Sequence, residues 1–599
     1  MCLTPMGPLL ASSRIGKQRT PSGSVVYVAF GSFAVFNNSS ASWRSGFSSR
    51  AGCFVGQWEI GLRLRKDESG IIGSEEIKDK LGRVLGDLGF KERAASVAKV
   101  LESVLLQEFD ENILAQHLNK ASSLLEELHT ITYEAKTSEA KTQVVYMGKP
   151  HAIAIPYPAQ GHVLLMLELS QRLAMQHDIK VTVVNTDFNH ARVIKSISDS
   201  DKLQESVNLI SIPDGLEPWE DRNDISRLRE GMCQVMLPEL EAVINKLNGK
   251  NCTEGRGDDK VTCVIADGSM TWALGVADKA GLRKVACWTV SGLAAASLLS
   301  IPKLVSDGII DSHGRIQKHE MVRFAPDSPP IHSTNFIWAS FGCKPTFNSR
   351  KFHSLLKLAD RHICNSSFSL ETGVFSAYPN ITPLGPLLAS TGHRKSLGYF
   401  WPPDPASLAW LDRHPTNSVV YVAFGSFTRF GREQFDELAL GLELTGRPFL
   451  WVVRGDTEET YPDGFMERVG ERGLIVRWAP QQQILSHPSV ACFVSHCGWN
   501  STVEGVVCGG VPFVCWPYFA DQFLNETYIC NEWKIGLRLR KDENGIIGRG
   551  EIEDKVESVL SHKSYKERAL DLQRKTMDGI RGGKSHENLN DFIEWIKRN

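Results

Sequence analysis

The sequence lacks several features that would place the protein in a membrane or outside the cell. It has no apolar run of about 18 residues, the length that a membrane-spanning helix needs. Its start has neither the basic residues nor the apolar core of a secretory signal peptide. Its 13 cysteines include no C-x-x-C pair and no zinc spacing, and the neighbours His496 and Cys497 alone do not make a metal site. We therefore expect a cytoplasmic protein with reduced thiols, no transmembrane segment and no bound metal.

Neither sign of charge is in excess, because 67 basic residues face 69 acidic ones. This balance argues against a nucleic-acid partner or a highly charged membrane surface. The G-x-S-x-G motif of many serine hydrolases is also missing. At 599 residues the chain is too long for one hydrophobic core, so we expect two or more domains, and we expect a monomer.

An internal repeat sets the first part of the chain apart. Ser24–Phe33 recurs unchanged as Ser418–Phe427, and Trp58–Gly73 recurs with two differences as Trp533–Gly548. The offsets are 394 and 475 residues, so the first copy is 81 residues shorter between the two matches. We interpret residues 1–146 as a truncated duplicate plus a helical connector, from either a fusion or two joined gene models. A short apolar strand without partners is unstable in water, so we expect this irregular extension to be poorly ordered.

From Met147 onward, apolar strands alternate with helices. His151–Ile155 is a predicted strand, Val163–Ala174 a predicted helix and Ile179–Asn185 a second strand. This alternation predicts an α/β fold with a doubly wound parallel sheet. In such sheets ligands bind at the carboxyl ends of the strands.

Two residues at such strand ends are candidates for catalysis. His162 lies on the first turn of its predicted helix, and Asp267 ends the predicted strand Val261–Ala266. A lone histidine there is more often structural, yet the positive end of the helix disfavours imidazolium and keeps the ring neutral, as a general base requires. Asp267 could orient that ring. A second acidic motif, Asp199-x-Asp201, lies in a polar run and is predicted to be a solvated loop.

The stretch from Trp478 to Gln522 reads as strands separated by a glycine turn and a helix start. Such a helix start binds anions through its unpaired N–H groups and its dipole. Trp478 offers a face for a planar base and Glu504 could hold a ribose, while His496, Asn500 and Ser501 suit a diphosphate, and Asp521 with Gln522 suits a hexose. The plainer alternative is a helix cap, since Ser501 and Glu504 also fit a capping box.

This stretch, running from W-A-P-Q through H-C-G-W-N-S-x-x-E to D-Q, resembles the donor-binding signature of plant family 1 UDP-dependent glycosyltransferases. The segments Ile155–His162 and Ser211–Leu216 resemble its branch called family 83. The resemblance implies the GT-B fold, in which two Rossmann-like domains face a cleft, and it implies His162 and Asp267 as the catalytic pair. The donor-binding residues it implies are Ser426, Trp478, Ala479, Gln481, His496, Gly498, Trp499, Asn500, Ser501, Glu504, Asp521 and Gln522.

The resemblance also divides the chain. It implies an acceptor-binding domain over residues 147–383, a linker over 384–405 and a UDP-sugar-binding domain over 406–599. Leu589, Phe592, Ile593 and Ile596 recur at helical spacing, so residues 588–599 are predicted to form an amphipathic closing helix. In the family this helix packs back on the N-terminal domain. The small apolar run Cys287–Ala296 suits core or an acceptor pocket wall, and we favour core.

The implied function is an inverting UDP-glycosyltransferase of secondary metabolism, with no metal and no cofactor beyond the UDP-sugar co-substrate. Gln522 with Trp499 implies UDP-glucose as donor. The acceptor is expected to be a small lipophilic hydroxylated plant metabolite such as a flavonoid or phenylpropanoid. One departure from the family keeps an alternative open: the stretch counts 45 residues, one more than usual, with the extra residue in Gly505–Gly510. The alternative is a catalytically impaired nucleotide-sugar-binding protein.

Overall fold

The computed structural model describes residues 34–35, 43–45, 71–72, 149–196, 207–249, 260–341, 349–387, 400–401, 404, 406–454 and 460–598. The chain forms two compact units, Met1–Val145 and Tyr146–Asn599. In the first unit, β1 (Ala34–Val35), β2 (Trp43–Ser45) and β3 (Ile71–Ile72) pair in antiparallel fashion. The predicted strand over 25–30, the connector over 101–146 and the acidic motif at 199–201 lie outside the described residues and stay predictions.

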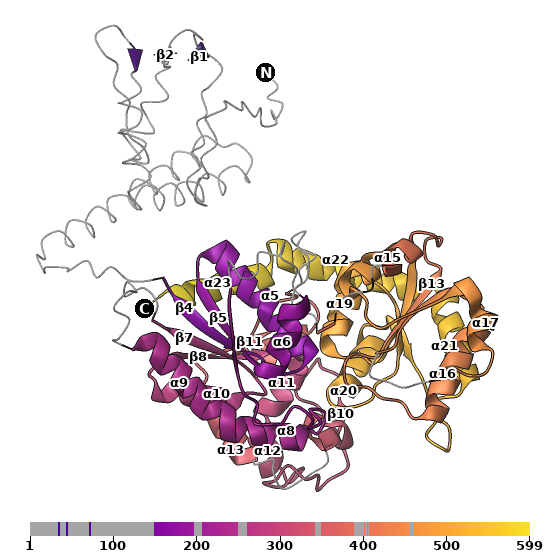
Figure 1. Cartoon of the computed structure of the whole chain (residues 1–599), viewed down its shortest axis with the longest axis horizontal. Coiled ribbons are helices and arrows are strands. Elements are labelled where there is room, and N and C mark those ends of the chain that lie inside the picture. The colour runs from indigo at the N-terminus through magenta and orange to yellow at the C-terminus, as the bar shows by residue number, and fades with distance from the viewer. Residues whose placement is uncertain are drawn as a thin grey trace, which may run out of the picture. The chain divides into compact units, whose positions relative to one another are not determined.

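The second unit begins with a seven-stranded parallel sheet in the order β12-β11-β8-β7-β4-β5-β6. Its strands are buried on both faces, which explains their almost continuous apolar sequences. Helices cover the two faces (Figure 1). The strands are β4 (His151–Ile155), β5 (Lys180–Thr186), β6 (Asn208–Ile212), β7 (Cys263–Asp267), β8 (Arg283–Trp288), β11 (Arg361–Cys364) and β12 (Ile381–Pro383).

A six-stranded parallel sheet follows, in the order β15-β14-β13-β16-β17-β18. The predicted strands of the signature stretch fall on three of these elements. The strands are β13 (Val419–Ala423), β14 (Phe449–Val452), β15 (Gly473–Val476), β16 (Val490–Ser495), β17 (Phe513–Cys515) and β18 (Gly536–Arg538). Both sheets are therefore built of βα units, as the alternation of apolar segments predicts.

The helices that position the site connect these strands. In the first sheet they are α5 (Gln160–His177), α8 (Ile225–Gly231), α10 (Thr271–Lys279), α11 (Gly292–Leu299) and α13 (Ser349–Leu356). In the second they are α15 (Ala406–Leu411), α16 (Arg432–Leu444), α18 (Gln481–Ser486), α19 (Trp499–Gly509), α20 (Gln522–Thr527) and α21 (Arg549–Ser561).

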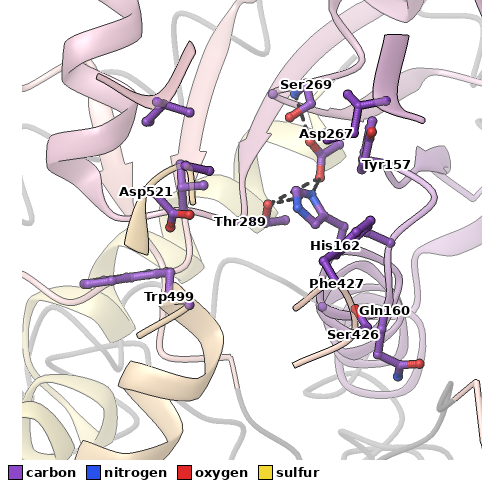
Figure 2. Close-up of a pocket in the computed structure, with 18 of the residues that line it drawn as sticks. Tyr157, Gln160, His162, Asp267, Ser269, Thr289, Ser426, Phe427, Trp499 and Asp521 are labelled. Atoms are coloured by element: carbon purple, nitrogen blue, oxygen red, sulfur yellow. Dashed lines mark hydrogen bonds and ion pairs between the residues drawn. The ribbon is translucent and has the colours of Figure 1, made fainter. Parts of the chain in front are cut away.

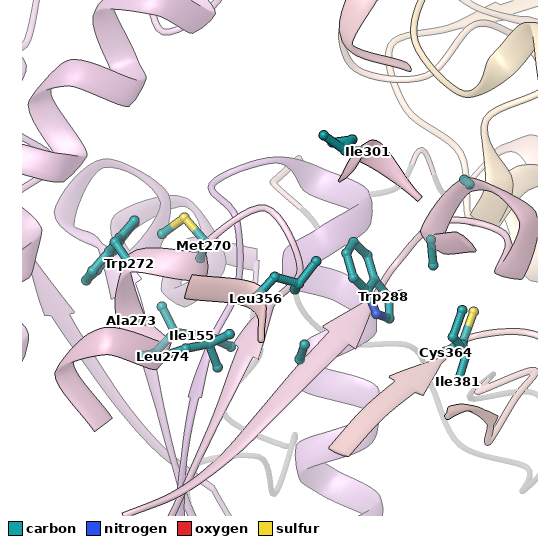
Figure 3. Close-up of a cluster of buried hydrophobic side chains, with 14 of the residues drawn as sticks. Ile155, Met270, Trp272, Ala273, Leu274, Trp288, Ile301, Leu356, Cys364 and Ile381 are labelled. Atoms are coloured by element: carbon teal, nitrogen blue, oxygen red, sulfur yellow. The ribbon is translucent and has the colours of Figure 1, made fainter. Parts of the chain in front are cut away.

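One of the two buried clusters of the first sheet lies between its strands and the helices of one face. Figure 3 shows Ile155 of β4 and Trp288 of β8 in one cluster with Met270, Trp272 and Leu356 from the loop and helices above them. Trp288 is 2% exposed and Ile155 is fully buried. Burying such side chains stabilises the fold by roughly 1.5–3 kcal/mol each. This packing fixes the positions of the strand ends. It therefore also fixes the positions of the candidate site residues that follow them.

The C-terminal helices return to the first sheet. After α22 (Lys563–Arg581), α23 (Lys584–Lys597) buries Leu589, Phe592, Ile593 and Ile596 in a cluster with residues of β4, β5 and α5. The amide of Asn588 also donates to the Pro383 carbonyl at 2.9 Å. The helix begins earlier than the predicted 588, and Ser585, one turn before Leu589, is buried as well. In Figure 1, α22 leads back from the second sheet, and α23 lies near α5 over the first sheet.

Among the helices that the structure describes, none is both long and apolar enough to cross a membrane. In that same part of the chain, no three His, Cys, Asp or Glu side chains gather as a metal ion would require.

Candidate active site

One cavity of about 950 Å³ lies between the two sheets of the second unit. Both halves contribute to its lining, and every residue predicted for the site takes part. The predicted residues that line it are His162, Asp267, Ser426, Trp478, Ala479, Gln481, His496, Gly498, Trp499, Asn500, Ser501, Glu504, Asp521 and Gln522. The carboxyl ends of two parallel sheets therefore meet at one cavity, as the topology rule for such sheets predicts.

His162 is the third residue of α5 and turns its ring toward the end of β7. Its Nδ1 lies 2.7 Å from Oδ2 of Asp267, which is the last residue of β7 and 1% exposed. The backbone N–H of Ser269 donates to the other oxygen, Oδ1, at 2.8 Å, so the carboxylate is held on both sides. A carboxylate at Nδ1 favours the tautomer with its proton there. Nε2 is then the basic nitrogen (Figure 2).

Two opposing influences set the protonation of His162. Burial of the ring lowers its pKa, whereas the charge of Asp267 and the hydrogen bond to it raise the pKa, with a further contribution from Asp521. The net result is a pKa raised above 6.5. The helix start was expected to lower this pKa, and the net shift has the opposite direction. A full charge at 2.7 Å outweighs the partial charge of a helix end.

Two further residues touch the pair and were not predicted as site residues, although Tyr157 lies in the segment Ile155–His162 and Thr289 in the run Cys287–Ala296. Thr289, directly after β8, has Oγ1 at 2.8 Å from Nδ1 of His162 and at 3.5 Å from Oδ2 of Asp267. Tyr157, two residues after β4, packs its ring 5.3 Å from the imidazole, and burial raises the pKa of Tyr157 to about 12. The sequence signal for both was their place just beyond a strand end.

The signature helix α19 begins at Trp499, with Gly498 at its N-cap and no side-chain cap. The predicted capping box of Ser501 and Glu504 is therefore wrong. Because the helix starts three residues earlier than a cap at Ser501 would require, Ser501 is its third residue and Glu504 lies beyond its first turn. The N–H groups of the first turn remain available at the cavity, as an anion site requires.

Glu504 belongs instead to a buried amide network. Its Oε2 accepts from Nε2 of Gln481 at 2.6 Å, and its Oε1 accepts from Nε2 of Gln482 at 3.0 Å. Gln481 also donates to Oγ of Ser501 at 2.8 Å and accepts from the Tyr421 hydroxyl at 3.1 Å. Burial raises the pKa of Glu504 against these two hydrogen bonds. Each carboxylate oxygen keeps a further lone pair for a hydroxyl group.

Asn500 links the two halves of the unit. Its Nδ2 donates to the Gly161 carbonyl at 2.9 Å, directly before His162 in the chain. Its Oδ1 accepts from Nδ2 of Asn365 at 3.1 Å. Trp499 is buried beside it and donates its indole N–H to the Asn365 carbonyl at 2.7 Å. The indole N–H of Trp499 is thus used in a hydrogen bond within the protein. Trp499 can contribute to ligand binding through its backbone at the start of α19.

His496 follows β16 and packs between two glycines. A Cβ atom on Gly425 would stand 2.7 Å from its Nε2, and one on Gly498 would stand 2.5 Å away, so both positions need glycine. Burial lowers the pKa of His496 to about 4, against a smaller opposing effect of the Ala423 backbone. The ring is therefore neutral near pH 7 and can offer a diphosphate a hydrogen bond but no positive charge.

The loop that carries Ser426 is held from behind by a buried cation. Arg454 donates to the carbonyl of Ser426 through Nη1 and to that of Thr428 through Nη2, the latter at 3.3 Å. Arg454 is 8% exposed. These bonds fix the backbone of the loop, and Ser426 lines the cavity. Sequence reasoning missed Arg454 because it is far from every motif.

The predicted hexose partners lie at the start of α20. Asp521 directly precedes that helix without a side-chain cap bond and accepts from Nδ2 of Asn525 at 2.9 Å, and burial raises the pKa of Asp521. Oε1 of Gln522 accepts from the backbone N–H groups of Tyr518 at 2.7 Å and Phe519 at 3.0 Å. Gln522 can therefore offer a sugar its amide NH2 group. The extra residue of the signature falls at the end of α19 and does not remove either side chain from the cavity.

Trp478 follows β15 and packs against Trp401, with 5.0 Å between the ring centroids. Its carbonyl accepts from the N–H of Asp404 at 2.9 Å, which ties the end of the interdomain linker to the signature. Ala479 beside it is buried. The ring is held by these contacts and still lines the cavity, where a planar group could stack on it.

The half of the cavity beyond His162 is mostly apolar. Its wall includes Met232, Trp272, Trp338 and Phe352. The run Cys287–Ala296 contributes both to the hydrophobic core and to the pocket wall, the two roles considered for it from the sequence. Cys287 and residues 293–296 are core, whereas residues 288–290 line the cavity.

Comparison with known proteins decides the family. A profile described as "UDP-glucoronosyl and UDP-glucosyl transferase" matches residues 404–581. UDP-glycosyltransferase 83A1 of Arabidopsis thaliana is 42% identical over 468 residues, which cover 75% of this chain and 97% of that protein. This chain belongs to the plant family 1 UDP-glycosyltransferases. The 7-deoxyloganetin glucosyltransferase of Catharanthus roseus is 32% identical over 490 residues, covering 76% of this UDP-glycosyltransferase and 97% of the relative.

Solved structures give the same architecture for this UDP-glycosyltransferase. Phytolacca americana UGT2, complexed with UDP-2fluoro-glucose and pterostilbene, is 25% identical with a TM-score of 0.62 and covers 75% of this chain and 99% of its own. Medicago truncatula UGT71G1, complexed with UDP-glucose, is 26% identical with a TM-score of 0.62 and the same coverage. The predicted GT-B fold of two Rossmann-like domains is confirmed.

Proposed function

We propose that this UDP-glycosyltransferase transfers glucose from UDP-glucose to a hydroxyl group of a small lipophilic plant metabolite, with inversion at the anomeric carbon. One observation supports this most: the His162–Asp267 pair and the donor signature line the same cavity. A base, an anion-binding helix start and an apolar wall are the parts that glycosyl transfer needs. Neither a metal ion nor a redox cofactor takes part in the proposed reaction.

In the proposed reaction, Nε2 of His162 removes the proton from the acceptor hydroxyl. The acceptor oxygen then attacks the anomeric carbon from the face opposite UDP, and the bond from that carbon to the diphosphate oxygen breaks. Asp267 stabilises the imidazolium that forms, and Thr289 helps to hold the ring. The proton leaves the imidazolium for solvent once the products depart.

The donor would lie along the signature residues. The uracil stacks on Trp478, Glu504 accepts from the ribose hydroxyls, and the N–H groups at the start of α19 bind the diphosphate. One preorganised N–H group that donates a hydrogen bond to developing charge in this way typically contributes about 10²- to 10³-fold to the rate. Neutral His496 adds a hydrogen bond, and Asp521 with the NH2 group of Gln522 binds the glucose hydroxyls.

The acceptor would occupy the apolar half of the cavity. Walls of tryptophan, methionine and phenylalanine suit a flat or ring-shaped lipophilic molecule. A flavonoid or phenylpropanoid with one hydroxyl near His162 fits this description. Among the similar proteins, the name of one includes 7-deoxyloganetin, and one structure holds pterostilbene.

A histidine substitution tests the proposal. His162→Ala should lower kcat/KM by about 10²- to 10⁴-fold, because it removes the base. The matched control is His177→Ala at the other end of the same helix, which should leave turnover close to wild type. UDP release from UDP-glucose with a panel of plant phenolics measures both. Near wild-type turnover of His162→Ala would refute the proposed base.

The same assay decides between an enzyme and a nucleotide-sugar-binding protein. A protein that only binds the nucleotide-sugar would retain UDP affinity in calorimetry but release no UDP with any acceptor. Competition between UDP-glucose, UDP-galactose and UDP-xylose would then test the choice of sugar donor. A higher rate with UDP-galactose or UDP-xylose would contradict the assignment of UDP-glucose.

A further inference from the structure

Two thiols in the donor-binding half lie close together, behind the residues proposed to bind the sugar. Sγ of Cys530 lies 3.7 Å from Sγ of Cys515. Cys515 ends β17 and is fully buried, while Cys530 lies in the helical turn Tyr528–Glu532 and is partly exposed. Forming a disulfide, in which the sulfurs are about 2.05 Å apart, would need a shift of only about 1.7 Å.

The exposed side of Cys530 opens into a surface cavity of about 660 Å³ that is rich in cations. Its charged lining residues are Lys534, Arg538, Arg540, Lys555 and Arg568, and Tyr565 adds an aromatic face. The carboxylates that pair with these cations are Glu526, on Arg538, and Glu551 and Asp554, on Lys555. The cavity therefore holds more positive than negative charge and suits a small anionic ligand.

One of these cations is bonded to groups without charge. Arg568 donates from Nε to the Lys534 carbonyl at 2.6 Å and lies over the Tyr565 ring at 5.0 Å from its centroid. Its guanidinium is therefore held in place at the cavity wall. Such a fixed guanidinium recognises a carboxylate through paired N–H groups.

The segment between the two thiols carries the proposed sugar partners. Residues 516–529 include Asp521 and Gln522, and α20 continues without a break into the turn that holds Cys530. Gln522 in turn fixes the backbone at Tyr518 and Phe519. A bond between Cys515 and Cys530 would join both ends of this segment. A shift at Cys530 would then be passed along one helix to Gln522.

We propose that Cys530 is a site of thiol–disulfide exchange with glutathione disulfide, that Cys515 resolves the mixed disulfide, and that the resulting Cys515–Cys530 bond weakens UDP-glucose binding. The anionic carboxylates of glutathione match the cations of the cavity, and Cys530 is the thiol that the ligand can reach. The effect on UDP-glucose rests on the function proposed above, whereas the exchange itself does not.

The exchange balances in two steps. The Cys530 thiolate attacks one sulfur of glutathione disulfide, the bond between the two glutathione sulfurs breaks, and one glutathione leaves and takes up a proton. Cys515 then attacks the Cys530 sulfur and expels the second glutathione, which takes the proton that Cys515 loses. Two protein thiols are oxidised and one glutathione disulfide is reduced. Burial keeps the pKa of Cys515 well above that of a free thiol, which makes Cys530 the first to react.

Incubation of the full chain with glutathione disulfide, followed by peptide mapping, tests the exchange without any need for turnover. The wild type should show a Cys515–Cys530 bond, and Cys515→Ser should retain glutathione on Cys530. The matched control is Cys508→Ser, a partly exposed thiol of the same domain, which should behave like the wild type. A map in which neither Cys530 adduct nor Cys515–Cys530 bond forms would overturn the proposal.

Calorimetry with UDP-glucose, before and after oxidation, tests the consequence. We expect the oxidised wild type to bind UDP-glucose about threefold or more weakly and dithiothreitol to restore the affinity. Cys530→Ser and Cys530→Ala should keep the same affinity under both conditions. Equal weakening in these two variants would refute a role of Cys530. If UDP-glucose does not bind the reduced protein at all, the proposed function fails. The peptide map of the disulfides still tests the proposed thiol–disulfide exchange in that case.

Discussion

At the scale of single residues, the contacts around His162 decide how the site responds to pH. The ring is a quarter exposed, and its Nδ1 faces both a buried carboxylate and a threonine hydroxyl. Burial alone would lower its pKa, but Asp267 raises it above the ordinary value. Asp267 therefore both holds the His162 ring in place and makes it more basic. As the pH falls, His162 becomes protonated at a higher pH than an isolated histidine would.

This arrangement predicts a change in the pH profile. In the wild type, kcat/KM should fall as pH drops through the raised pKa of His162, so the acidic limb should lie above pH 6.5. Asp267→Asn removes the charge that raises the pKa, so the limb should move to lower pH while the maximum rate falls. Rates measured from about pH 5 to pH 9 check both effects. An unchanged limb in Asp267→Asn would mean that another group sets it.

At the scale of elements, helix α19 is positioned by close contacts along its whole length. Its first turn faces the cavity, and its last turn presses on α18 and β17. A Cβ atom on Gly509 would stand 2.0 Å from the Leu485 carbonyl oxygen, and one on Gly505 would stand 2.3 Å from the Phe513 ring. The N–H groups of Gly510 and Val511 close the helix on the carbonyls of Val506 and Gly505. Tight packing at the C-terminal end of α19 therefore helps to fix the position of its N-terminus at the cavity.

A glycine substitution in this helix should therefore destabilise the protein. Gly509→Ala should lower the free energy of unfolding by about 1–3 kcal/mol, because backbone must shift to admit the methyl group. Gly550→Ala in α21 is the matched control. It meets nothing within 4 Å, so we expect it to be neutral or stabilising by about 0.5–1 kcal/mol. Thermal unfolding of both variants measures the difference. Equal melting temperatures would contradict the close packing.

At the scale of the whole molecule, two parallel sheets share one cavity, and α23 fastens the end of the chain to the first sheet. The lining of the cavity runs from Tyr157 to Gln522, so each part of it comes from the second unit. The repeat in the first 146 residues lacks the 81 residues that hold a signature stretch. It therefore has no donor site of its own to add.

A shortened chain tests the role of that extension. A protein beginning at Met147 should show unchanged kcat/KM and equal or better solubility, because the lining of the cavity lies wholly after this residue. The full chain, assayed in parallel, is the control. A loss of more than about tenfold, roughly 1.4 kcal/mol of transition-state stabilisation, would show that the extension contributes to catalysis.

The sequence alone determined the βα alternation and the strand ends, because buried parallel strands are apolar on both faces and end in small or polar residues. The motifs at His162, Asp267 and Trp478–Gln522, through the family that they resemble, also gave fourteen of the residues that line the cavity. Only the tertiary structure decided the contacts between distant segments. Asn365 and Arg454 carry no local pattern, and the strand-end position of Thr289 does not name its partners, since these roles arise where separate strands and loops meet.

The same distinction explains why the capping box and the direction of the His162 pKa shift could not be predicted. The capping box failed because a helix start depends on the backbone path after β16, and α19 begins at Trp499. The direction of the His162 pKa shift could not be predicted because the decisive charge, Asp267, is 105 residues away in the chain. Periodicity and short motifs report on neighbours in sequence. Protonation, hydrogen-bond partners and the closeness of Cys515 to Cys530 depend on neighbours in space, which the packing of the two sheets determines.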